Sequence, residues 1–309
     1  MDEDRDMKLG LLTAPFEDWT LEKVAAWAGP EGFGALEVAC WPAASGDRRR
    51  YAGTSHIDVS DMTAGRGSEI TGMLASHGIE ISGLGYYPNP LHPDTETAEA
   101  AREHIRAVIT AAGTMGVKVV NTFMGGDRTR TPDENWEAAT EVFDPIVRHA
   151  KDSGVTLAFE NCPMIFTYDE WPGGHNIAYS PKIWRRILER WDGVGMNFDP
   201  SHLVWQMIDQ TRFMNEFAPA FAHVHAKDVM IDRDGLYENG VMSVGMGWQI
   251  PRLCGLGDVD WGDFFSALYR HGYDGPVIIE HEDKVFEGTD DKLKRGFKIA
   301  QGVLAPYIQ

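Results

Sequence analysis

Short apolar segments alternate with longer amphipathic segments along nearly the whole chain. The short segments are rich in Val, Ile, Leu and Phe, as is typical of strands buried on both faces of a parallel sheet. The predicted strands span residues 8–12, 34–38, 80–84, 117–123, 155–160, 194–198, 221–228 and 276–280. The repeated order of strand and amphipathic segment predicts consecutive βα units.

The segments between these strands carry signals for helix ends. Thr131 and Glu134 have the spacing of a capping box, with Pro132 at the first helical position. Apolar residues then recur at helical spacing up to Ala150. Glycines stand before several of the following strands, where a helix commonly ends: Gly78, Gly116, Gly154 and Gly193.

Successive βα units in one chain predict an α/β fold of the (β/α)8 type, a TIM barrel, formed by a single domain over residues 1–309. A doubly wound sheet is the alternative, but no Gly-x-Gly-x-x-Gly follows the first strand. Two connections are long, 41–66 after the second strand and 229–257 after the seventh. Both leave the catalytic face of such a barrel, so we expect lids or subunit contacts.

Composition narrows the possible partners. The 309 residues carry a net charge of −19, which argues against nucleic acid and anionic membranes as partners. Three cysteines without close spacing argue against a disulfide framework or a structural zinc site. The acidic N-terminus lacks the apolar segment of a signal peptide, and no apolar run reaches ~18 residues. We therefore expect a cytoplasmic protein.

Polar residues end four successive predicted strands. They are Glu160, Asp199, His225 and Glu280. Because neighbouring strands of a barrel end on the same face, these side chains are expected to converge. Three carboxylates and one imidazole suit a hard or borderline divalent cation, with Mn²⁺ expected first and Mg²⁺ or Co²⁺ as alternatives. Taken singly, each carboxylate is equally well explained as a helix cap or a loop anchor.

Further titratable residues lie near these positions. Alternation along a strand puts His223, His225 and Lys227 on one face. Lys227, at the rim, is interpreted as a substrate contact or a partner of a loop carboxylate, and His202 as a substrate contact. His223 is expected to be a satisfied core histidine, and Glu37 a buried, paired structural carboxylate.

Two groups of loop residues leave their interpretation open. Trp41, Trp205 and Trp248 form either a wall that stacks against a sugar or ordinary loop packing. The arginines at 48–50 are more typical of a solvated surface than of a site.

Five segments carry a resemblance to a known family. They are Phe-Glu-Asn at 159–161, Asn-Phe-Asp-Pro-Ser-His at 197–202, His-Ala-Lys-Asp at 225–228, Gly-Leu-Gly-Asp-Val-Asp-Trp at 255–261 and Glu-His at 280–281. Over essentially its full length the chain resembles the sugar phosphate isomerase/epimerase family. These are xylose-isomerase-like TIM barrels that include the ketose 3-epimerases related to tagatose epimerase.

The resemblance implies roles for particular residues. It implies that the four strand-end residues bind a divalent metal, and that Glu160 and Glu280 also act as the acid/base pair. It implies that His202 contacts a substrate oxygen and that Arg252 binds substrate. The expected activity is a metal-dependent sugar isomerase or epimerase that transfers a proton through an enediolate of a keto-sugar.

A narrower resemblance gives the alternative activity. Residues 49–58 and 174–180 look like loops of a bacterial subgroup that includes the large subunit of C-glycoside deglycosidases. The resemblance implies a lyase on 3-oxo-glycosides with a small β-rich partner subunit, whereas the wider family implies a homo-oligomer. An apurinic-site endonuclease, which shares the barrel, is disfavoured by the charge, and a non-catalytic sugar-binding barrel by the acid/base pair.

Overall fold

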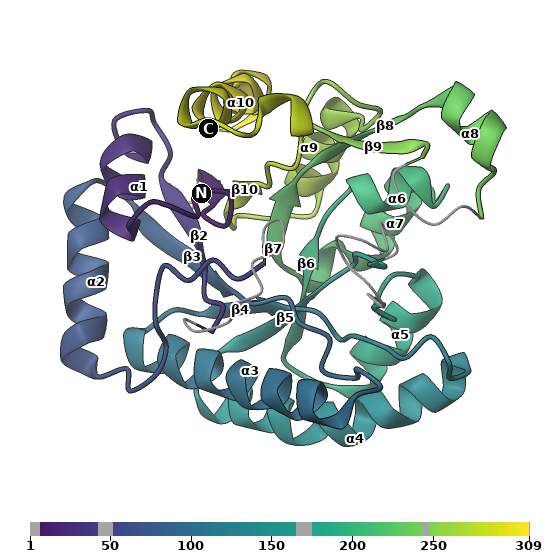
Figure 1. Cartoon of the computed structure of the whole chain (residues 1–309), viewed down its shortest axis with the longest axis horizontal. Coiled ribbons are helices and arrows are strands. Elements are labelled where there is room, and N and C mark those ends of the chain that lie inside the picture. Colours follow the sequence, from purple (N-terminus) through teal and green to yellow (C-terminus); the bar gives the residue numbers. More distant parts are fainter. Residues whose placement is uncertain (1–6, 43–51, 165–174, 243–246, 309) are drawn as a thin grey trace.

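The computed structural model describes residues 7–42, 52–164, 175–242 and 247–308. Eight parallel strands close into a barrel, with helices around it (Figure 1). In spatial order the strands are β1 (Leu9–Leu12), β10 (Val277–Ile279), β7 (Phe221–Ala226), β6 (Val194–Phe198), β5 (Thr156–Glu160), β4 (Val119–Thr122), β3 (Glu80–Gly85) and β2 (Ala35–Ala39). The predicted (β/α)8 barrel is therefore confirmed.

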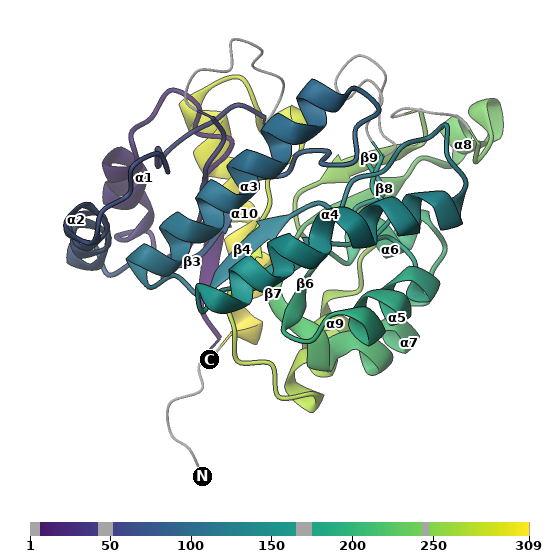
Figure 2. The same cartoon turned by 90° about the horizontal axis from the view of Figure 1, so that it is seen from below.

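Amphipathic helices cover the outside of the barrel, and Figure 2 shows α3 and α4 lying side by side along one flank. The helices are α1 (Leu21–Ala28), α2 (Ala64–Ser76), α3 (Thr95–Met115), α4 (Pro132–Asp152), α5 (Pro181–Arg190), α6 (Ser201–Trp205), α7 (Gln210–Phe217), α9 (Trp261–Arg270) and α10 (Asp290–Leu304). The buried faces of most of these helices are mainly apolar, as the helical spacing predicts, whereas α6 buries Ser201 and His202 beside Leu203. None of the helices in the described part of the chain is both long and apolar enough to cross a membrane.

The predicted helix ends are borne out at the residues that signalled them. Thr131 and Glu134 cap each other at the start of α4, which is the capping box expected from their spacing. Gly116 follows the last residue of α3 in the left-handed region, at φ 77°. A residue with a Cβ would be strained there, which is why glycine commonly ends a helix.

The long connection from 229 to 257 contains regular secondary structure. Within its described residues it holds β8 (Asp228–Ile231), α8 (Arg233–Asn239) and β9 (Gln249–Arg252). The two strands pair antiparallel as a small separate sheet. Loops this long rarely lack secondary structure. Here the strand pairing provides hydrogen bonds for the backbone N–H and C=O groups of the segment.

Asp228 connects the segment that contains β8, α8 and β9 to the barrel. Its buried carboxylate accepts hydrogen bonds from the backbone amides of Val229, Gly255 and Val259 and from the indole Nε1 of Trp261, at 2.9–3.0 Å. A Cβ on Gly257 would lie 2.3 Å from Asp228 Oδ1. Residues 255–261, the Gly-x-Gly-x-x-x-Trp segment, therefore fold around the Asp228 carboxylate.

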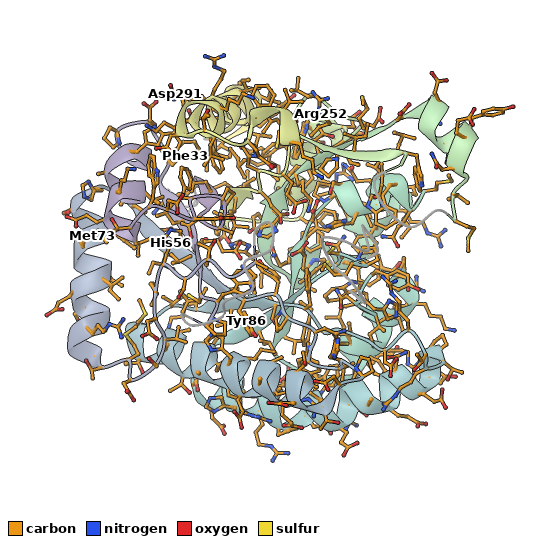
Figure 3. The ribbon with its side chains drawn as sticks, in the orientation of Figure 1. Phe33, His56, Met73, Tyr86, Arg252 and Asp291 are labelled. Carbon is orange, nitrogen blue, oxygen red and sulfur yellow. The ribbon has the colours of Figure 1, made fainter. Side chains whose placement is uncertain are left out.

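Residues 43–51 of the connection after β2 are not described, so the arginines at 48–50 lie outside the described residues. The described part is tied to the β1–α1 loop by His56 (Figure 3). One ring nitrogen of His56 lies 2.9 Å from Thr13 Oγ1, and the other lies 3.2 Å from the Phe16 carbonyl and 3.1 Å from the Trp19 carbonyl.

Candidate active site

A cavity of about 50 Å³ opens at the carboxyl ends of the strands. Its polar side is formed by Glu160, Lys227, Glu280 and Glu282. Its apolar side is formed by Leu12, Ala14, Trp41, Tyr87, Phe123, Cys162 and Met164. The barrel therefore presents charged and aromatic surfaces to one small space, at the face where barrels of this type carry their active sites.

Three of the four predicted metal ligands converge beside this cavity. The donor atoms of Glu160, His225 and Glu280 all lie within 4.8 Å of one another. His225 Nδ1 is 3.2 Å from Glu280 Oε2 and 3.7 Å from Glu160 Oε2. Two carboxylates and an imidazole around one point are a donor set that fits a divalent cation.

Asp199, the fourth predicted ligand, contacts two residues that also contact Glu160 and Glu280. Its Oδ2 lies 3.0 Å from Lys227 Nζ and 3.0 Å from His202 Nε2, while Oδ1 accepts a hydrogen bond from the Ser201 amide at 2.8 Å. It lies outside the convergent group of three. Strand position alone does not indicate these contacts, and the role of Asp199 as a metal ligand stays a prediction.

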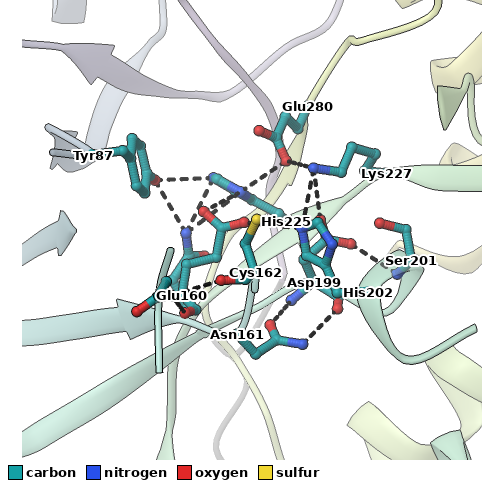
Figure 4. Close-up of polar contacts among 12 residues, drawn as sticks. Tyr87, Glu160, Asn161, Cys162, Asp199, Ser201, His202, His225, Lys227 and Glu280 are labelled. Carbon is teal, nitrogen blue, oxygen red and sulfur yellow. Dashed lines mark hydrogen bonds and ion pairs between the residues drawn. The ribbon is translucent and has the colours of Figure 1, made fainter. Parts of the chain in front are cut away.

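Lys227 lies among the carboxylates rather than at an open rim (Figure 4). Its Nζ is 2.8 Å from Glu280 Oε2, 3.0 Å from Asp199 Oδ2 and 3.3 Å from Glu282 Oε2, and the side chain is almost fully buried. Of the two interpretations of Lys227 from sequence, the structure bears out the ion pair. Because the residue also lines the cavity, contact with a substrate stays a prediction.

His202 lies in the short helix α6, three residues after Asp199. Trp205, one turn further on, donates its indole N–H to His202 Nδ1 at 3.3 Å. His202 Nε2 lies 3.0 Å from Asp199 Oδ2 and 3.3 Å from Glu160 Oε1. Burial alone would lower the pKa of His202, but the Asp199 carboxylate outweighs it and raises this pKa. Trp205 therefore orients the His202 imidazole next to the carboxylates.

The surroundings of Glu160 and Glu280 shift the pKa values of these two carboxyl groups in opposite directions. Burial and the nearby Glu280 carboxylate raise the pKa of Glu160. For Glu280 burial acts in the same direction, but the Lys227 ammonium and His225 outweigh it and lower its pKa to about 2. Two neighbouring carboxyl groups with different pKa values are the usual arrangement of an acid and a base.

A buried hydrogen-bonded group lies behind the candidate ligands. Glu37 Oε2 is 2.5 Å from His225 Nε2, and Glu37 Oε1 accepts a hydrogen bond from the Tyr87 hydroxyl. This confirms Glu37 as a buried, paired carboxylate. His223 is buried too, with its ring nitrogens 2.9 Å from Asn197 Oδ1 and 3.1 Å from Ser82 Oγ, so it is a satisfied core histidine as expected.

The remaining predicted residues divide between the cavity and its surroundings. Trp41 lines the cavity, whereas Trp248 packs against Trp205 at 6.4 Å between ring centroids. Arg252 lies on β9, with its Nε 2.9 Å from Asp283 Oδ2, and is not among the residues that line the described cavity (Figure 3). Its role toward substrate stays a prediction.

Sequence reasoning did not single out Tyr87 or Glu282. Glu282 stands two residues after Glu280, so an extended backbone would bring both side chains to the same side. That signal was available in the sequence. Tyr87 follows β3 by two residues, and nothing in its local sequence distinguishes it from an ordinary packing tyrosine.

The chain belongs to the xylose isomerase-like TIM barrel family, whose model matches residues 25–303. Over 312 aligned residues it is 26% identical to the uncharacterized protein YfiH of Bacillus subtilis, covering 90% of this chain and 93% of that protein. It is 27% identical over 200 residues to inosose dehydratase of Geobacillus thermodenitrificans, covering 62% of this chain and 64% of that enzyme.

Solved structures share the fold at low identity. An L-ribulose 3-epimerase matches with a TM-score of 0.67 at 16% identity, covering 97% of this chain and 95% of that chain. The zinc-containing IolI protein matches with a TM-score of 0.69 at 16% identity, covering 97% and 99%. The 3-keto-D-glucoside 4-epimerase YcjR of E. coli matches with a TM-score of 0.67 at 15% identity, covering 97% and 98%. These likenesses show the shared barrel fold, and two of the three matched proteins are named as sugar epimerases.

Proposed function

We propose that the protein is a divalent-metal-dependent isomerase or epimerase of a keto-sugar. The observation that carries the proposal is the convergence of Glu160 and Glu280 around His225 at the cavity. Epimerisation by removal of a proton from one face of a carbon next to a carbonyl and return to the other face needs one acid/base group on each face. The positions of these two residues on β5 and just after β10 support that arrangement.

Glu160, His225 and Glu280 would hold the metal, with Asp199 as the candidate fourth ligand. When bound, the cation supplies a Lewis acid for the substrate carbonyl, and Mn²⁺ is the first candidate for an oxygen-rich set. The zinc in the IolI structure supports a divalent cation in this family.

The chain's own residues perform the proton transfer. One of Glu160 and Glu280 removes the proton next to the carbonyl, which leaves an enediolate, and the other returns a proton. Return to the opposite face of the same carbon gives an epimer. Return to the former carbonyl carbon gives an isomer, with a proton moving from the neighbouring hydroxyl oxygen to the former carbonyl oxygen. Lys227 and His202 would contact substrate oxygens, since both lie beside the two glutamates.

A second candidate is an elimination from a 3-oxo-glycoside, as in a C-glycoside deglycosidase. The aromatic side of the cavity, formed by Trp41, Tyr87 and Phe123, favours it because an aglycone could pack there. The similarity to inosose dehydratases also fits, since loss of water next to a ketone uses the same proton removal. This candidate would use a small β-rich partner subunit, whereas the isomerase would form a homo-oligomer.

The test is proton exchange in D₂O. The purified protein is analysed for bound metal and incubated with free ketoses and, separately, with 3-oxo-glucosides that carry a reporter aglycone. Deuterium next to the carbonyl of a ketose, with an epimer or aldose formed, is expected from the isomerase. Release of the aglycone would instead establish the elimination.

Variants connect the chemistry to the site. Glu160→Gln and Glu280→Gln should each abolish formation of the epimer, because an amide can neither take up nor return the proton at neutral pH. Glu80→Gln is the matched control, since Glu80 pairs with Lys8 at the surface. Full epimer formation in both site variants, with the fold intact, would refute the proposed acid/base pair.

A further inference from the structure

Glu37 and Tyr87 form a buried connection between the cavity wall and His225. Glu37 is fully buried on β2, on the far side of the imidazole from the two candidate acid/base residues. Figure 4 shows the ring of His225 between Tyr87 and Glu280. The connection is therefore made of side chains from three different strands or strand ends.

The hydrogen bonds of Glu37 determine which way His225 faces. His225 Nε2 lies 2.5 Å from Glu37 Oε2, so the Nε2–H donates to this carboxylate. The neutral ring then carries its lone pair on Nδ1, the nitrogen 3.2 Å from Glu280 Oε2. Glu37 is thus the acceptor that fixes the orientation of the ring.

Tyr87 and Gly85 hold Glu37 in this orientation. The Tyr87 hydroxyl donates to Glu37 Oε1 and lies 3.1 Å from Asn197 Nδ2, which donates to it. A Cβ on Gly85 would lie 2.4 Å from Glu37 Oε1. Any larger residue at 85 would therefore displace the carboxylate, although nothing at that position touches the cavity directly.

We propose that Glu37, held by Tyr87 and by the absence of a side chain at Gly85, is the positioning residue that presents His225 Nδ1 to a bound divalent cation. The inference rests on the proposed function in so far as His225 is a metal ligand. Partners of this kind orient the ring and increase its basicity, and their loss typically weakens metal binding about 10- to 100-fold. Tyr87 lines the cavity as well, so it connects the substrate side with the ligand.

The experiment measures metal affinity rather than turnover. The dissociation constants of Mn²⁺ and Zn²⁺ are determined by calorimetry with a competing chelator for wild type, Glu37→Gln, Tyr87→Phe and Gly85→Ala. We expect Glu37→Gln to bind about 10- to 100-fold more weakly. Tyr87→Phe and Gly85→Ala should fall between wild type and Glu37→Gln, because the carboxylate remains but is less well held.

Matched controls separate orientation from general damage. Tyr273→Phe removes a buried hydroxyl that donates to the Pro276 carbonyl at 2.7 Å, and Gly72→Ala adds a Cβ in α2 where no atom lies within 4 Å. Both should bind metal as wild type does. If Glu37→Gln does not fold, Gly85→Ala carries the test, because it leaves every polar group in place.

A spectroscopic measurement distinguishes this inference from the proposed function. The Nε2–H of His225, bonded to a carboxylate, should give a strongly downfield proton signal in wild type that moves upfield in Glu37→Gln. Wild-type metal affinity together with an unmoved signal in folded Glu37→Gln would overturn the inference. If the wild type binds no metal, the proposed function fails, and the signal in the metal-free protein still decides the role of Glu37.

Discussion

The ammonium of Lys227 lies 2.8 Å from Glu280 Oε2, so a side chain that follows β7 neutralises the carboxylate that follows β10. The same ammonium is 3.0 Å from Asp199 Oδ2. A protein cation therefore lies between the group formed by Glu160, His225 and Glu280 and the remaining candidate ligand. This arrangement makes the roles of Lys227 and Asp199 separable by experiment.

Lys227→Met should destabilise the metal-free protein by about 3–5 kcal/mol, because it leaves buried carboxylates without their counter-charge. Added Mn²⁺ should recover much of the loss, since a cation again neutralises the carboxylates. Thermal unfolding in EDTA and in Mn²⁺ measures both effects. Lys151→Met is the control, because Lys151 pairs with Asp192 at the surface. Equal stability of Lys227→Met and wild type in EDTA would contradict the prediction.

Asp199→Asn tests whether Asp199 becomes the fourth ligand when metal binds. If it does, the affinity for Mn²⁺ should fall at least about 10-fold, since even partners outside the ligand set have effects of that size. Calorimetric titration of the purified variant measures the change. Unchanged affinity combined with lower stability would assign Asp199 to pairing with Lys227 and His202 alone.

Asp228→Asn should destabilise the barrel and loosen the β8–β9 sheet. The carboxylate accepts four hydrogen bonds, and an amide nitrogen would face N–H donors on one side. Unsatisfied buried donors cost about 1–3 kcal/mol each, so urea unfolding should show a loss of about that size or more. Limited proteolysis should cut the variant faster between 229 and 257. Asp192→Asn, on an almost fully exposed side chain, should change neither measurement.

The stability of the fold should depend on the protonation of His56. Burial lowers the pKa of His56 below its ordinary 6.5, although the carbonyls of Phe16 and Trp19 partly oppose the shift. Below pH ~6.5 the unfolded chain then binds more protons than the folded one, so stability falls as the pH falls toward the lowered value. The midpoint of urea unfolding measured from pH 7.5 to 5.5 should therefore decrease more steeply in wild type than in His56→Gln. Parallel slopes would show that another group causes the dependence.

Much of the barrel could be predicted because its strands and helices are local in sequence. Each predicted strand overlaps an observed one to within a few residues, and Thr131 and Gly116 mark helix ends through backbone preferences that act over one turn. The sequence did not predict the small sheet of β8 and β9, because these two strands pair residues about twenty positions apart in a Gly-rich segment.

The candidate site was predictable in residue type but not in pairing. The sequence predicts that Glu160, His225 and Glu280 lie close together, because the parallel strands of a barrel end on one face. Nothing in the sequence indicates that Lys227 Nζ lies against Asp199, since rotamers and depth decide that contact.

The sequence by itself determined the order of strands and helices, the barrel and the residue types at its mouth, because periodicity and caps act between near neighbours in the chain. The tertiary structure alone decided that Glu37 meets His225, a contact across 188 positions. It also decided that Gly85 must lack a side chain to leave Glu37 its place. Contacts of this kind depend on closing the barrel, which brings β2 and β7 to face each other across its interior.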